Sequence, residues 1–119
     1  MALIHAGQPV FVDRRVHASI ARGILLGKAD VRTYAHADYG HLERRLASAP
    51  PAAVQPLVMT ESLFSMDGTE LDVSRMAELR SKYGFFLMVD EAHAVGALGP
   101  GGRGLCAGVP GTADIVLGT

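Results

Sequence analysis

A short apolar run that ends abruptly in charged residues constrains the fold of this chain more than any other feature. Residues 85–89 read FFLMV, and Asp90, Glu91, Ala92 and His93 follow directly. A continuous apolar run of this length is typical of a strand that is buried on both faces of a parallel sheet. In open α/β sheets, ligands bind just outside the carboxyl ends of the strands. The run therefore predicts that Asp90 and His93 reach a ligand-binding edge together.

Strand-like and helix-like segments alternate along the rest of the chain. The patterns predict further strands at 10–12, 30–34, 57–60 and 114–117, and helices at 17–26, 38–47 and 72–83. Asp38 and Asp72 stand at N-cap positions, and Gly84 stands where the last helix should end. Glu78 and Lys82, four positions apart, predict an exposed ion pair. Repeated strand–helix–strand units predict an α/β fold, with a mainly parallel sheet and helices on both faces.

The composition argues against several classes of partner and compartment. The chain has 119 residues and a formal net charge of −1, so neither nucleic acid nor an anionic membrane is expected as the main partner. No apolar run is long enough for a transmembrane helix, and the N-terminus lacks the pattern of a secretory signal. Cys106 is the only cysteine, so an internal disulfide is impossible and a reducing, cytoplasmic compartment is expected.

Residues 90–93 read DEAH, which also fits two other kinds of site. An ATP-hydrolysing motor presents such a motif, but it needs a G-x-x-x-x-G-K-[ST] loop, and neither Lys28 nor Lys82 follows one. A zinc site at His93 has no second ligand at helical spacing. Taken alone, Ser65 is typical of a turn before an Asp-Gly pair, and His17 of a surface residue or helix cap. No single motif therefore decides the function.

Together, the motifs resemble the α-oxoamine synthase family of pyridoxal-phosphate enzymes, which have the aspartate-aminotransferase-like fold, fold type I. The matching stretches are DRRVHASI (13–20), TESLFSMDG (60–68) and LMVDEAHAVGALG (87–99), with weaker or shorter matches at 36–42, 102–104 and 114–119. The resemblance implies an enzyme that condenses an acyl-CoA, or an acyl carrier protein thioester, with alanine or glycine and loses CO₂. The motifs are nearest to members that act in biotin biosynthesis. The alternative within the family is a member that uses glycine, of the glycine acetyltransferase or aminolevulinate synthase kind.

The resemblance also implies which residues bind pyridoxal 5'-phosphate. Asp90 would lie against the pyridine nitrogen and keep it protonated, which helps the ring to act as an electron sink. His93 would bond the phenolic oxygen, and His17 would stack on the face of the ring. Ser65 would lie near the phenolic oxygen or the substrate carboxylate, and Thr119 would contact the phosphate. The family forms homodimers with the active site at the subunit interface, and no metal is implied.

The same resemblance implies that residues 1–119 are the central part of a cofactor-binding large domain. Three parts of the family's enzymes are expected to lie outside this sequence: the N-terminal segment, the Schiff-base lysine and the C-terminal small domain. The family carries this lysine three positions after the residue that matches Thr119. The chain alone is therefore expected to be inactive, and a non-catalytic truncated remnant is the alternative to an enzyme.

Glu61 also follows an apolar strand and is expected near the site. Ala37 stands where the family pattern has Asn, and Val16 where it has Asn or Ser.

Overall fold

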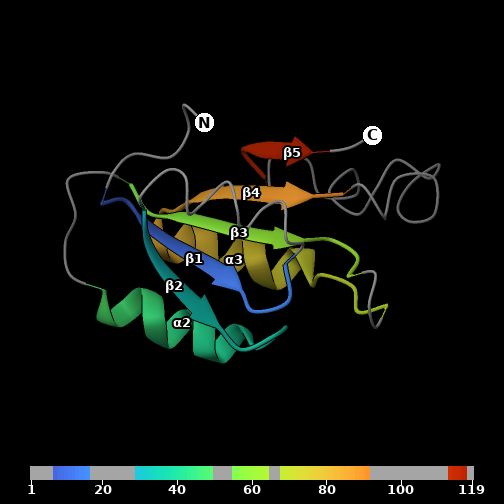
Figure 1. Cartoon of the computed structure of the whole chain (residues 1–119), viewed down its shortest axis with the longest axis horizontal. Coiled ribbons are helices and arrows are strands. Elements are labelled where there is room, and N and C mark those ends of the chain that lie inside the picture. Colours follow the sequence, from blue (N-terminus) through green and yellow to red (C-terminus); the bar gives the residue numbers. More distant parts are fainter. Residues whose placement is uncertain (1–6, 17–28, 50–54, 65–67, 92–112, 118–119) are drawn as a thin grey trace.

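A single parallel sheet organises the chain. The computed structural model describes residues 7–16, 29–49, 55–64, 68–91 and 113–117. Within these residues the elements are β1 (Pro9–Asp13), β2 (Asp30–Tyr34), α2 (Tyr39–Ser48), β3 (Leu57–Glu61), α3 (Val73–Tyr83), β4 (Phe86–Asp90) and β5 (Ile115–Leu117). The strands lie in the order β2-β1-β3-β4-β5, and every pairing is parallel (Figure 1). The predicted α/β class with a mainly parallel sheet is confirmed.

Alternate residues of the central strands point to opposite faces of the sheet, and each face has its own apolar cluster. The cluster on the helix-covered face joins strand residues to α2 and α3, and includes Phe11, Val58, Leu87, Val89, Leu42, Leu46, Met76 and Leu79. The cluster on the other face consists of Val10, Val12, Leu57, Met59 and Met88. Both described helices cover the same face (Figure 1). The helix predicted at 17–26 lies outside the described residues, so the prediction of helices on both faces stays open.

Local signals in the sequence set the ends of the two helices. The Asp38 carboxylate accepts a hydrogen bond from the backbone N–H of His41 at 2.9 Å, and Asp72 accepts one from Arg75 at 3.0 Å. Each carboxylate thereby satisfies a backbone donor that the first helical turn leaves without a partner. Gly84 ends α3 in the left-handed conformation, with φ of 70°. All three predicted helix boundaries are confirmed.

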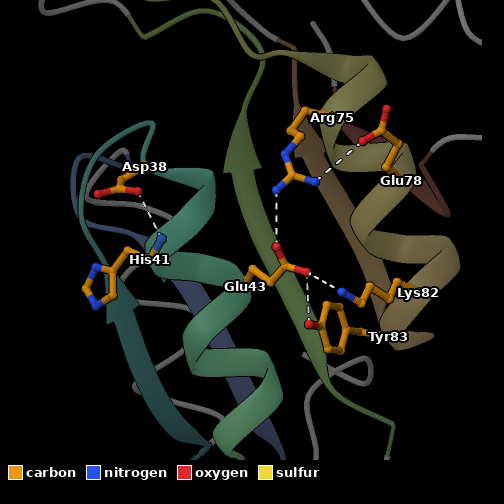
Figure 2. Close-up of polar contacts among 7 residues, drawn as sticks. All are labelled: Asp38, His41, Glu43, Arg75, Glu78, Lys82 and Tyr83. Carbon is orange, nitrogen blue, oxygen red and sulfur yellow. Dashed lines mark hydrogen bonds and ion pairs between the residues drawn. The ribbon is translucent and has the colours of Figure 1, made fainter.

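A polar network joins α2 to α3 on their outer side. The carboxylate of Glu43 in α2 accepts hydrogen bonds from Lys82 Nζ at 2.8 Å, the Tyr83 hydroxyl at 3.0 Å and Arg75 Nη2 at 3.2 Å (Figure 2). The predicted ion pair between Glu78 and Lys82 is wrong, because Lys82 binds Glu43 and Glu78 pairs with Arg75. A partner on another helix therefore takes precedence over the neighbour four positions away.

The Glu43 network should make the stability of the fold depend on pH. Hydrogen bonds from Lys82, then from Tyr83 and Arg75, lower the pKa of Glu43 from 4.5 to about 2. A lowered pKa stabilises the fold above pH 4.5, and this contribution is lost as the pH falls toward 2. Glu43→Gln should therefore lower the urea midpoint at neutral pH, modestly because the network faces solvent. The midpoints of the wild type and of Glu43→Gln should converge below pH 4.5, and a difference that stays constant with pH would refute this role.

Candidate functional site

The carboxyl ends of the parallel strands meet at one edge of the sheet, which we call the carboxyl edge. Glu61, the last residue of β3, lies opposite Asp90, the last residue of β4, and Asp90 lies opposite Leu117 of β5. The backbone N–H of Ser62 donates to the carbonyl oxygen of Asp90 at 3.0 Å and extends this pairing beyond the strands. The strand arrows in Figure 1 all point toward this edge. Asp90 and Glu61 therefore stand side by side where parallel sheets bind ligands.

Asp90 and Glu61 lie on the face of the sheet opposite α2 and α3. Met88 and Met59 belong to the apolar cluster of that face, and the two acids follow them by two positions in the same strands. Neighbouring strands are about 4.8 Å apart, so the two carboxyl groups leave the backbone as close neighbours. Two like charges at this spacing oppose each other, and each favours a cation nearby. The arrangement is suited to a positively charged group.

Asp90 differs from the other acids of the carboxyl edge in its exposure. Asp13 is 2% exposed, Glu61 3% and Glu91 2%, whereas Asp90 is only half-buried. The hydroxyl of Ser62, next to Glu61, is buried and has no hydrogen-bond partner within the described part of the chain. An accessible carboxylate beside the buried Glu61 fits a ligand that brings a cationic nitrogen.

Four of the five predicted site residues lie outside the described residues: His17, Ser65, His93 and Thr119. They follow the last residues of β1, β3, β4 and β5, respectively, by two to four positions. Their positions in space and their contacts therefore stay predictions.

A second polar cluster at the carboxyl edge was missed by sequence reasoning. Asp13, at the end of β1, pairs with the Nδ1 atom of His36 at 2.9 Å and accepts backbone hydrogen bonds from Arg15 and Ala37, each at 2.9 Å. The His36 ring stands edge-on to Phe64, with the ring centroids 4.5 Å apart. Asp13 and His36 lie in stretches that resemble the family, but no role was predicted for either residue. The available signal was that Asp13, like Asp90, directly follows an apolar strand.

Tyr34, which lies opposite Asp13 at the end of β2, adds a neutral group to this cluster. Its side chain is 1% exposed. Burial, and after it the nearby Asp13 carboxylate, raises the pKa of Tyr34 far above its ordinary value, against a smaller opposing effect from its hydrogen bond with Thr60. The phenol of Tyr34 therefore stays protonated and uncharged.

Ala37 has a backbone conformation that suits another residue better. Its φ is 53°, in the left-handed region where a Cβ atom costs about 1–2 kcal/mol, and Asn and Gly tolerate this region. Asn is also the residue that the family pattern carries here. Ala37→Asn should therefore raise the free energy of unfolding by about 0.5–1 kcal/mol in urea titrations. Ala37→Val is the matched control. Its branched side chain tolerates this region least, so this variant should have a lower free energy of unfolding.

The acids of the carboxyl edge are spread over different strands and both faces of the sheet. Asp13 follows Phe11 onto the helix-covered face, whereas Glu61 and Asp90 lie on the other face. Among the described residues, no three His, Cys, Asp or Glu side chains gather closely enough to hold a metal ion. None of the helices in this part of the chain is long and apolar enough to cross a membrane.

Comparison with known proteins identifies the family. The sequence matches the profile of the family Aminotransferase class I and II over residues 1–119. A curated relative from Chlorobaculum parvum, named 8-amino-7-oxononanoate synthase, is 48% identical over 112 residues, which cover 92% of this chain and 29% of the relative. A relative of the same name from Aromatoleum aromaticum is 44% identical over 106 residues, covering 89% of this chain and 27% of the relative. The chain thus spans less than a third of the length of these relatives.

Solved structures agree with the sequence relatives. A serine palmitoyltransferase from S. paucimobilis with bound PLP–myriocin superposes with a TM-score of 0.90 and 35% identity, over 98% of this chain and 30% of that protein. The 8-amino-7-oxononanoate synthase of Francisella tularensis gives a TM-score of 0.71 and 29% identity, over 96% of this chain and 30% of that protein. The predicted fold type I architecture is therefore confirmed. By a profile that covers its whole sequence, the chain belongs to the aminotransferase class I and II family, among the α-oxoamine synthases that its motifs resemble.

Proposed function

We propose that this chain is the central part of the cofactor-binding large domain of a pyridoxal-phosphate-dependent C-acyltransferase. The whole enzyme joins an acyl-CoA or an acyl carrier protein thioester to a small amino acid and releases CO₂. Among such enzymes we favour 8-amino-7-oxononanoate synthase of biotin biosynthesis, because curated relatives of that name share 48% and 44% of their matched residues with this chain.

The position of Asp90 carries this proposal. Its carboxylate ends β4 at the carboxyl edge, remains half-buried, and stands beside the buried Glu61 on the face opposite α2 and α3. A protonated pyridine nitrogen is a cation that fits such a carboxylate, since the ion pair favours the charged form of both groups. The pyridoxal phosphate bound to a serine palmitoyltransferase of similar fold supports the same choice of ligand.

Each site residue has a limited task in the proposed enzyme. When bound, pyridoxal phosphate supplies an electron sink for the negative charge that develops at the α-carbon of the amino acid. Asp90 holds a proton at the pyridine nitrogen, and His93 donates a hydrogen bond to the phenolic oxygen. His17 covers the face of the ring and excludes water from it. Ser65 orients the phenolic oxygen or the substrate carboxylate, and Thr119 binds the phosphate.

The proposed partners follow from the same family. The enzyme acts as a homodimer in the cytoplasm, with its active site at the interface between the two copies. Its substrates are a thioester and an amino acid, and it uses no nucleic acid or membrane. The near-neutral charge of the chain supports the absence of a polyanionic partner.

The proposed reaction can be tested on the whole protein that contains this chain. The purified protein, loaded with pyridoxal phosphate, is given an acyl thioester with alanine, glycine or serine, and the release of free thiol is measured. The proposal predicts release that depends on alanine. A requirement for glycine would favour the glycine-using members, and a requirement for serine would favour the palmitoyltransferases to which the fold is similar. No release with any of the three amino acids would favour the non-catalytic remnant.

A further inference from the structure

The partly buried contact between Asp13 and His36 joins loops that follow two different strands. We infer that these two residues form a positioning pair, which orients the segments leading to His17 and Ser65 without touching the cofactor. The inference rests on the proposed function, because it concerns how the cofactor site is held in shape. No motif assigns this task to either residue.

Asp13 fixes the turn that leads to His17. Its side chain accepts a hydrogen bond from the backbone N–H of Arg15 at 2.9 Å, and its carbonyl oxygen accepts one from Val16 at 3.1 Å. The backbone N–H of Arg14 donates to the carbonyl of Tyr34 at 3.0 Å, which ties the turn to β2. Each residue from 14 to 16 therefore has its backbone donor engaged. The direction in which the chain leaves Val16, directly before His17, depends on Asp13.

His36 connects this turn to the loop after β3. Its Nδ1 atom contacts Asp13 at 2.9 Å, and its ring meets Phe64 edge-on at an interplanar angle of 84°. Phe64 is 3% exposed, its N–H donates to the carbonyl oxygen of Thr69 at 2.9 Å, and its own carbonyl oxygen accepts from Gly68 at 2.8 Å. Ser65 directly follows Phe64 in the sequence. We therefore expect a displacement of the His36 ring to shift Phe64, the residue that directly precedes Ser65.

Asp13 itself is poorly placed to contact a cofactor. Its side chain is 2% exposed, both of its carboxylate oxygens have partners, and it follows Phe11 onto the helix-covered face. Asp90 lies on the opposite face and is the accessible acid. A purely structural role for Asp13 would change folding stability alone, whereas a positioning role must also change the surroundings of the bound cofactor.

The test compares three variants of the whole protein, each titrated with pyridoxal phosphate. Asp13→Asn removes the charge that holds the turn, and His36→Asn keeps a donor for Asp13 while it removes the ring that meets Phe64. Asp114→Asn is the matched control, because Asp114 also accepts a backbone N–H, from Leu87 at 2.8 Å, but lies just before β5 at the opposite edge. The dissociation constant of the cofactor and the visible circular dichroism of the bound cofactor are measured at equal saturation.

The positioning role predicts that Asp13→Asn and His36→Asn raise the dissociation constant of pyridoxal phosphate about tenfold. A loss of affinity of this size is typical when a group that orients a ligand-binding residue is removed. Both should also alter the visible circular dichroism, and Asp114→Asn should change neither. Unchanged binding and dichroism in both variants would overturn the inference and leave the proposed function intact. If Asp13→Asn does not fold, His36→Asn alone decides by the same two readouts. A wild-type protein that binds no pyridoxal phosphate would overturn the proposed function and the inference with it.

Discussion

Asp90→Asn should lower kcat/KM of the whole protein by about a hundredfold or more, the size of effect seen when one preorganised electrostatic group is removed from an active site. Asn has nearly the same shape as Asp, so the end of β4 should keep its structure. The amide carries no charge, and the pyridine nitrogen would lose the interaction that keeps it protonated. Steady-state kinetics at saturating pyridoxal phosphate measure this loss, and saturation separates it from weaker cofactor binding.

Asp30→Asn is the matched control for this variant. Asp30 begins β2 at the opposite edge of the sheet and forms an exposed ion pair with Arg32 at 3.0 Å. The same chemical change there should leave kcat/KM unchanged, because an exposed ion pair contributes little and lies far from the carboxyl edge. Equal kinetics for the wild type and Asp90→Asn would remove Asp90 from the proposed site.

Phe11→Ala should lower the free energy of unfolding by about 3–5 kcal/mol, since the substitution removes a buried aromatic ring and leaves a cavity. Phe11 is fully buried in β1, between β2 and β3, and belongs to the cluster that joins the sheet to α2 and α3. The net stability of a protein is about 5–15 kcal/mol, so this single change removes a large share of it. Urea titration followed by far-ultraviolet circular dichroism measures the loss.

Val31→Ala is the control for the apolar core. Val31 lies in the edge strand β2 and is 39% exposed, so its truncation should cost less than about 0.5 kcal/mol. A cost for Phe11→Ala as small as that for Val31→Ala would mean that the face covered by α2 and α3 is not the main core of this part of the protein.

The strands and helix ends were predictable because their causes are local. Asp38, Asp72 and Gly84 act on backbone groups within their own turn, so a short stretch of sequence determines both helix starts and the end of α3. The apolar run 85–89 likewise predicted β4, which the structure shifts by one residue to Phe86–Asp90, since a strand buried on both faces needs apolar residues throughout.

Interactions between distant segments were not predictable in the same way. Glu43 binds Lys82 and Tyr83 across 39 and 40 positions, and no local spacing distinguishes that ion pair from the one expected within α3. The contact between Asp13 and His36 spans 23 positions and depends on β1 and β2 lying side by side. Such contacts become visible only when the order of the strands is known.

The candidate site was predictable to the extent that strand ends define it. Asp90 lies at the carboxyl edge, as its position after an apolar run indicated, and Glu61 lies beside it. The contacts proposed for His17, Ser65, His93 and Thr119 come from the family resemblance, because strand patterns locate an edge of the sheet but not the path of the loops beyond it.

A crystal structure of the whole protein with pyridoxal phosphate bound would show whether Asp90 binds the cofactor. We expect a carboxylate oxygen of Asp90 at about 2.7–2.9 Å from the pyridine nitrogen, the distance of a charge-assisted hydrogen bond. We also expect the ring to lie on the face of the sheet opposite α2 and α3. A cofactor bound elsewhere, or a pyridine nitrogen with no contact to Asp90, would contradict the proposed role of Asp90.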